Sequence, residues 1–173
     1  MTTYDLAILL LGLAVGLTFA AHGAQKAFGW WGGPGMAGWQ GAMDQMGFHP
    51  ARLFAIVSMG AELIGGLFLA VGFLVPLAAA VLVAQTIVII LQVHLPKGFW
   101  SAKGGFEFAL QLGVGALVLG IVGRGALSLD NALGLSLSST ARVELILLGL
   151  LAGLVAYAIP RLGSRTPTTP QAR

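Results

Sequence analysis

The feature that most constrains this chain is a series of five long apolar stretches. They cover residues 5–25, 52–73, 76–95, 105–123 and 141–160. An α-helix needs about 20 mainly apolar residues to cross the roughly 30 Å hydrocarbon core of a bilayer. The pattern therefore predicts an all-α integral membrane protein, in which a four-helix transmembrane bundle is followed by a fifth transmembrane helix near the carboxyl end.

The composition supports this class and excludes others. Of the 173 residues, 57% are hydrophobic and 9% are charged, whereas about 25% of an ordinary soluble domain is charged. A soluble globular enzyme is therefore excluded. The net charge of +3 does not indicate a nucleic-acid partner, because most lysines and arginines flank the apolar stretches. Since cysteine is absent, any redox chemistry must use a bound cofactor.

The spans and their connections suggest three parts. Residues 1–130 are predicted to form a four-helix membrane domain, with a surface loop or helix at 29–50. Residues 131–160 supply a connection and the additional transmembrane helix, and residues 161–173 form a polar tail predicted to be disordered. No basic residue and no clear cleavage site mark the amino terminus as a signal peptide, so the first span is expected to remain uncleaved.

Within residues 29–50, a short amphipathic helix is expected to lie along the membrane surface or to fold back as a cap. Trp39, Ala42, Met43 and Met46 recur at helical spacing and would share its apolar face. Rows of small residues on the first and fifth spans predict close helix packing and offer faces for a homo-oligomer. These rows are Gly12, Gly16, Ala20 and Ala24, and Gly149 with Gly153.

The basic residues predict the orientation of the chain. With five spans, one side collects Lys26, Arg52, Lys97, Lys103, Arg161, Arg165 and Arg173, and the other side has Arg124 and Arg142. Basic loops stay in the cytoplasm. The carboxyl terminus is therefore predicted to be cytoplasmic and the amino terminus external, in what we expect to be a bacterial plasma membrane.

Polar side chains converge on one end of the predicted bundle. Because consecutive helices alternate in direction, the end of the first span meets the beginning of the second, the end of the third and the beginning of the fourth. The candidate site residues gathered there are His22, Gln25, Lys26, Glu62, His94, Lys97, Glu107 and Gln111. Ionisable groups inside a membrane are costly, and a polar pocket between helices is a common small-molecule site.

Glu62 is the residue with the strongest signal. At 1.5 Å per residue it lies about 15 Å below Arg52, where an unpaired carboxylate would cost several kcal/mol. It must be protonated or paired, and Lys26 or one of the histidines is the expected partner. The other candidates also have structural interpretations, because boundary lysines snorkel toward headgroups and Gln85 and Gln92 can join helices.

Several ligands fit such a pocket. A quinone would find apolar walls, donors from His22 and His94, and protons from Glu62 or Glu107, while Lys26 would balance negative charge. A small anion such as thiosulfate or sulfite is an alternative. Haem b, with His22 and His94 as axial ligands, ranks behind these. No other metal site is expected, because no His-x-x-x-His or Glu-x-x-His pair is present.

Five segments, in this order along the chain, resemble the DoxX family. They are His22-Gly23-Ala24-Gln25-Lys26, Glu62-Leu63-Ile64-Gly65-Gly66, His94 followed by Gly98-Phe99, Gly105-Phe106-Glu107-Phe108, and Gly123 to Asp130. The resemblance spans residues 5–130. It implies a four-helix membrane bundle related to the membrane subunit of thiosulfate:quinone oxidoreductase, an enzyme that works with a second subunit. The fifth span is an addition to the four spans that the resemblance implies.

These inferences lead to two main functional hypotheses. The first is a membrane subunit of a respiratory or sulfur-linked redox system, a quinone-linked oxidoreductase subunit that takes electrons from a soluble or membrane partner. The second is a non-catalytic scaffold that anchors soluble partners and in which the polar cluster fixes helix register. A haem-binding electron-transfer subunit ranks lower, because it requires the His22 and His94 rings to face one cleft. A small-ion transporter also ranks lower, because one polar pocket near one end is not a through-path and no second repeat of the motif is present.

Overall fold

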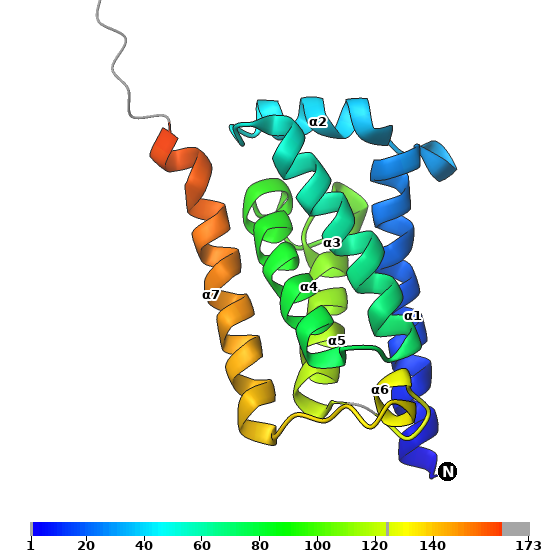
Figure 1. The fold of residues 1–173 in the computed structure, drawn as a ribbon. Helices are drawn as coiled ribbons and strands as arrows, with labels where there is room; N and C mark the ends of the chain where they lie inside the picture. The colour runs from blue at the N-terminus through cyan, green and yellow to red at the C-terminus, as the bar shows by residue number, and fades with distance from the viewer. Residues whose placement is uncertain (1, 124, 164–173) are drawn as a thin grey trace, which may run out of the picture.

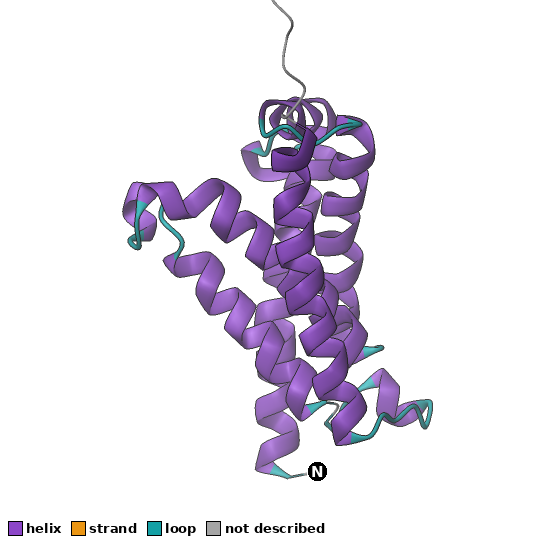
Figure 2. Cartoon of the chain, turned by 90° about the vertical axis from the view of Figure 1, so that its left-hand side faces the viewer, coloured by secondary structure: helices purple, strands orange, loops and turns teal. Residues whose placement is uncertain are grey.

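Long helices running side by side make up most of the protein. The computed structural model describes residues 2–123 and 125–163, and this part of the chain contains helices and short loops but no strand (Figure 2). The long helices are α1 (Thr3–Phe28), α3 (Ala51–Val71), α4 (Val75–Ile89), α5 (Glu107–Val122) and α7 (Ser139–Gly163) (Figure 1). The shorter α2 (Gly35–Gln45) and α6 (Leu129–Ala132) lie at opposite ends of the bundle. The prediction of an all-α membrane protein is confirmed.

Four helical segments are long and apolar enough to cross a bilayer. They are Thr3–Phe28, Ala51–Val71, Val75–Lys97 and Ser139–Leu162. The fourth predicted span is shorter, because α5 has 16 residues, or about 24 Å of helix. The chain before it makes a compact turn, in which Phe106 N donates to Gly98 O (3.1 Å) and Glu107 N donates to Phe99 O (2.9 Å). This turn delays the start of the helix to Glu107.

Small residues let α1 and α3 pack backbone to backbone. A Cβ atom on Gly16 would lie 2.5 Å from Ala70 N, and one on Gly66 would lie 2.5 Å from Ala20 N. Any larger side chain would push the helices apart. Close approach of this kind stabilises helix pairs in lipid, where packing rather than exclusion of water drives association. The small-residue row of the first span is thus occupied by contacts inside the chain.

The fifth helix, α7, lies at the edge of the bundle and packs along α4 and α5 (Figure 1). Gly149 and Gly153 of α7 lie against the backbone of Ala80 and Ala84 of α4. Its opposite side exposes Leu147, Leu148, Leu151, Leu154 and Val155. This apolar side suits contact with lipid.

The carboxyl end of α7 differs from the expectation. The sequence predicts that the helix ends at Pro160, but it continues through Gly163 with Pro160 inside it. The Arg161 guanidinium supports this turn, because Nη1 donates to Tyr157 O (2.8 Å) and the group stacks on the Tyr157 ring, 3.7 Å from its centre. The rest of the predicted tail, residues 164–173, lies outside the described residues.

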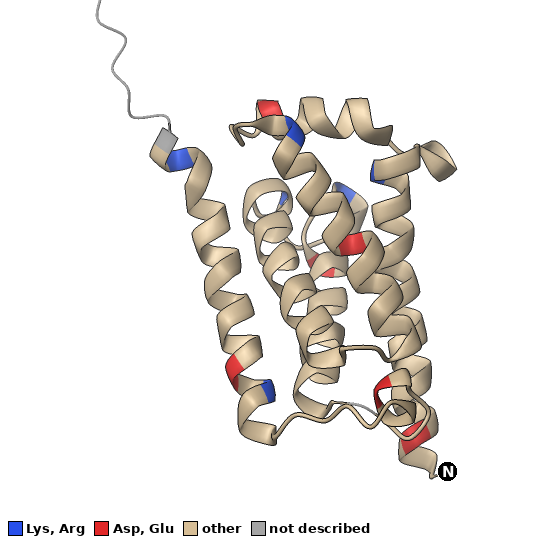
Figure 3. Ribbon diagram, in the orientation of Figure 1, with Lys and Arg blue, Asp and Glu red and all other residues tan. Residues whose placement is uncertain are grey.

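Basic residues gather at the end of the bundle that α2 covers (Figure 3). This end carries Lys26, Arg52, Lys97, Lys103 and Arg161, whereas Arg142 begins α7 at the opposite end. Arg124, Arg165 and Arg173 lie outside the described residues. In α2, Met43 is buried and Asp44 and Gln45 are exposed, so its apolar face turns toward the bundle.

Candidate functional site

A buried ion pair joins α1 to α3. Lys26 lies in the last turn of α1 and Glu62 lies in the middle of α3, and the antiparallel course of the two helices brings them together. Lys26 Nζ is 2.5 Å from Glu62 Oε1, and the two side chains are 12% and 2% exposed. Lys26 is thus the partner of Glu62, one of the alternatives that the sequence leaves open.

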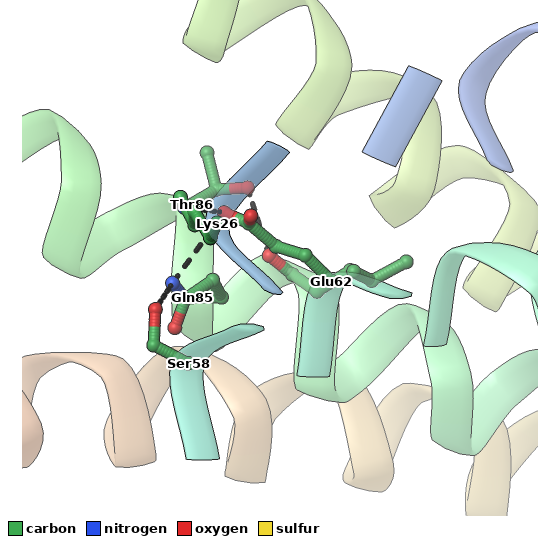
Figure 4. Close-up of polar contacts among 6 residues, drawn as sticks. Lys26, Ser58, Glu62, Gln85 and Thr86 are labelled. Carbon is green, nitrogen blue, oxygen red and sulfur yellow. Dashed lines mark hydrogen bonds and ion pairs between the residues drawn. The ribbon is translucent and has the colours of Figure 1, made fainter. Parts of the chain in front are cut away.

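A second layer of polar groups surrounds this pair (Figure 4). Gln85 Nε2 donates to Ser58 Oγ (2.6 Å) and lies 3.5 Å from Glu62 Oε1. Ser58 and Glu62 share one face of α3 because they are four residues apart. Gln85 therefore extends the polar network from Glu62 toward Ser58.

Two buried polar atoms in this region have no hydrogen-bond partner among the described residues. They are Glu62 Oε2 and Trp39 Nε1. Leaving a buried polar atom unpaired costs roughly 1–3 kcal/mol, and more for a charged group. Such atoms in a native site call for a ligand, an ion or water as a partner. One is an acceptor and the other is a donor.

A cavity of about 200 Å³ adjoins the ion pair. Its polar lining residues are His22, Lys26, Glu62, Thr86 and His94, and its apolar ones include Phe19, Trp39, Ile89, Val93, Phe108 and Leu112. These residues come from α1, α3, α4 with its following turn, and α5, and α2 contributes Trp39. The arrangement is an apolar chamber with a few convergent polar groups, as is typical of a small-molecule site.

His94 is placed in this cavity by a local irregularity of the helix. Residues Ile90–His94 form a π-helical turn at the end of α4, and such turns are frequent at functional sites. His94 Nδ1 lies 2.7 Å from the carbonyl oxygen of Gly104. Because a carbonyl can only accept, Nδ1 carries the hydrogen, which leaves Nε2 available to a ligand.

His22 and Lys26 complete the wall that α1 contributes. The His22 ring is half-buried and lies 5.8 Å from the Phe108 ring, centre to centre. Lys26 Nζ sits 4.3 Å from the centre of the Trp39 ring, a cation–π contact that strengthens away from water. The ammonium group therefore faces both a carboxylate and an aromatic ring.

The chain belongs to the DoxX family. The DoxX family model matches residues 7–95, about half of the chain. Comparisons with curated proteins and with solved structures gave no significant match.

The matched region of this DoxX protein runs from α1 to the turn that follows α4. It contains His22, Lys26, Glu62 and His94, which are the predicted site residues that line the cavity. The polar residues predicted on the fourth span, and α7, lie beyond it. The family resemblance that the sequence shows over residues 5–130 is therefore supported for the part that supplies these four residues.

The structure places the other four predicted site residues away from the cavity lining. Glu107 Oε2 accepts hydrogen bonds from Ser101 N and Oγ (3.0 Å each) because α5 begins at Glu107 and its first turn meets the preceding loop. Gln111 and Lys97 are exposed. Gln25 packs against Gly33 on the outer side of α1. The expectation that Glu107 and Gln111 share this pocket is corrected accordingly.

Sequence reasoning missed two parts of the site. It placed Trp39 on the apolar face of a surface helix, but it gave no sign that this face roofs the cavity. It also gave no sign of the π-helical turn that directs His94. Gln92, by contrast, joins segments, because it donates to Met46 O (3.3 Å) and accepts from Arg161 Nη1 (3.1 Å).

Proposed function

We propose that this DoxX protein is the membrane subunit of a redox system and binds a quinone head group in the cavity beside Glu62. One observation carries the proposal: Glu62, whose Oε2 has no hydrogen-bond partner in the described part of the chain, lines a chamber that also holds two histidines. Quinone reduction takes up protons together with electrons. Histidine and carboxyl groups are the side chains suited to deliver them.

The chemistry of the walls favours a flat, largely apolar ligand. Phe19, Phe108 and Leu112 offer apolar contact to a ring, and Nε2 of His94 can donate to a carbonyl oxygen when the imidazole is protonated. The Trp39 indole N–H is a second donor. Since the chain has no cysteine and supplies no electron carrier of its own, we propose that a partner subunit delivers the electrons.

A small anion is a weaker candidate for the same cavity. Lys26 is already paired with Glu62, so an incoming thiosulfate or sulfite would face a carboxylate as well as an ammonium group. Like charges in a poorly hydrated site repel strongly. The neutral quinone ring avoids this repulsion.

Haem b fits the cavity less well than a quinone ring. Both histidines line the chamber, but pockets for drug-sized ligands usually measure about 300–1,000 Å³, and this one holds about 200 Å³. The scaffold hypothesis is favoured by the Gln85–Ser58 contact, which ties α4 to α3.

Quinone titration of the purified protein tests the proposal. We expect Glu62→Gln to weaken binding of a reduced benzoquinone (a quinol) by about tenfold or more. The quinol hydroxyl can donate to the Glu62 carboxylate, and a hydrogen bond to a charged group contributes roughly 1.5–3 kcal/mol. Glu107→Gln is the matched control, because Glu107 lies outside the cavity and Gln retains an acceptor for Ser101. Equal affinity in both variants and the wild type would reject a role for Glu62 in the binding site.

The proposed arrangement in the membrane follows from the charges. We propose that residues 1–130 form the ligand-binding bundle, that α7 is an added peripheral span, and that the basic end faces the cytoplasm of a bacterial cell. This places the cavity nearer the cytoplasmic surface. A reporter enzyme fused after Arg173 should be active in the cytoplasm, and external activity would reverse the proposed orientation.

A further inference from the structure

A second cavity lies next to the first. It has a volume of about 130 Å³, and Trp39, Ile89 and Val93 line both chambers. Its other apolar lining residues include Met43, Phe48, Phe54, Val57, Val88 and Ala156. These residues come from α2, α3, α4 and α7 and from the loop after α2, so the second cavity lies on the α7 side of the shared wall.

The two cavities differ in chemistry. The first holds an ion pair and two histidines. The second contains no charged side chain in its lining, and its polar members Ser58, Gln85 and Gln92 are engaged with other groups, Ser58 and Gln85 with each other. A polar chamber that adjoins an apolar one matches a ligand with a polar ring at one end and an apolar chain at the other.

The second cavity also borders the lipid-facing surface of the bundle. Val57 lines it and is 58% exposed. At the end that carries α2, α3 approaches α7 (Figure 1), and Ile159 of α7 packs against the apolar cluster that includes Phe48 and Ala55. An apolar chain in this cavity can therefore continue past Val57 into the hydrocarbon of the bilayer.

We infer that the two cavities form one site for a lipid-soluble ligand, with the polar ring beside Glu62 and the first part of the apolar chain in the second cavity. The inference rests on the proposed quinone function and narrows its substrate to a quinone with a long chain. Together the chambers reach the lower end of the roughly 300–1,000 Å³ that is usual for such ligands. The indole of Trp39, which lines both chambers, marks the junction of ring and chain.

Filling the second cavity tests binding of the apolar chain independently of binding of the polar ring. Ala156 lines this cavity, whereas Ala152, one turn earlier on α7, is exposed. Ala156→Phe therefore places a ring in the chain site, and Ala152→Phe makes the same change on the lipid side. The probes are a decyl-substituted benzoquinone and the same benzoquinone with a methyl group in place of the decyl chain.

We expect Ala156→Phe to weaken binding of the decyl quinone by about tenfold, the equivalent of ~1.4 kcal/mol of overpacking. Binding of the methyl quinone should stay within about twofold of the wild type. Ala152→Phe should leave both affinities unchanged. Affinities come from quenching of tryptophan fluorescence, and thermal unfolding shows that each variant is folded. Val88→Phe repeats the test from the α4 side and replaces Ala156→Phe if that variant does not fold.

The outcomes distinguish this inference from the function on which it rests. Suppose that the wild type binds the methyl quinone, and that Ala156→Phe and Val88→Phe bind the decyl quinone with the affinity of the wild type. The proposed chain site is then rejected and the proposed ring site is retained. Equal loss of both probes in a folded filling variant also overturns the chain site. If the wild type binds neither probe, the proposed function itself fails.

Discussion

Replacing Lys26 with Met should lower the free energy of unfolding by about 3–5 kcal/mol, the usual cost of removing one partner of a buried ion pair. The substitution preserves most of the side-chain volume but leaves the Glu62 carboxylate, 2% exposed, without its counter-charge. The interface between α1 and α3 then contains a buried negative charge with no counter-charge. Chemical or thermal unfolding in mild detergent measures the loss.

The double variant Lys26→Met with Glu62→Gln provides the control. Because it removes both charges together, it should recover most of the stability that the single substitution loses. A double variant as unstable as Lys26→Met would mean that lost packing, and not the unpaired charge, causes the effect. Recovered stability combined with lost quinone binding would separate the binding role of the Lys26–Glu62 pair from its structural role.

Substituting Gly66 with Ala should be at least as damaging, with an expected loss of about 3 kcal/mol or more. The new Cβ atom would lie 2.5 Å from Ala20 N and 2.6 Å from Gly16 O. Both are backbone atoms, so no side chain can rotate away and α1 must move relative to α3. Loss of folded protein after extraction, or a lower unfolding temperature, is the measured result.

Gly60 offers a matched control on the same helix. A Cβ atom there meets nothing within 4 Å, and Ala favours the helix over Gly by about 1 kcal/mol. Gly60→Ala should therefore leave stability unchanged or raise it slightly. Similar losses in both variants would contradict the backbone contact of α1 with α3.

Much of the fold can be predicted from the sequence because each helix is long and apolar. Periodicity and length identify α1, α3, α4 and α7 with small errors at their ends. Two departures have local causes that hydropathy does not report: the turn before Glu107, which shortens α5, and the Arg161 side chain, which supports the last turn of α7.

The site is predictable to the extent that helix direction decides it. Alternating helices place His22, Lys26, Glu62 and His94 at one end, and these four residues line the cavity. Helix direction does not determine which face of a helix a side chain occupies. An argument from direction therefore also places Glu107 and Gln111 in the pocket, which they do not line. The register between segments far apart in the sequence, such as Trp39 over Lys26, depends on packing that no local pattern encodes.

The measurement that tests the central claim most directly is a reduced-minus-oxidised absorption spectrum of the protein, purified in mild detergent with its native lipid. A quinone bound beside Glu62 predicts an ultraviolet change typical of quinone reduction, without a Soret band, that is lost in Glu62→Gln and retained in Glu107→Gln. A Soret change that disappears when His22 or His94 is replaced would contradict the quinone site in favour of haem. A featureless spectrum that stays featureless after addition of quinone would contradict a redox pocket altogether and favour the scaffold.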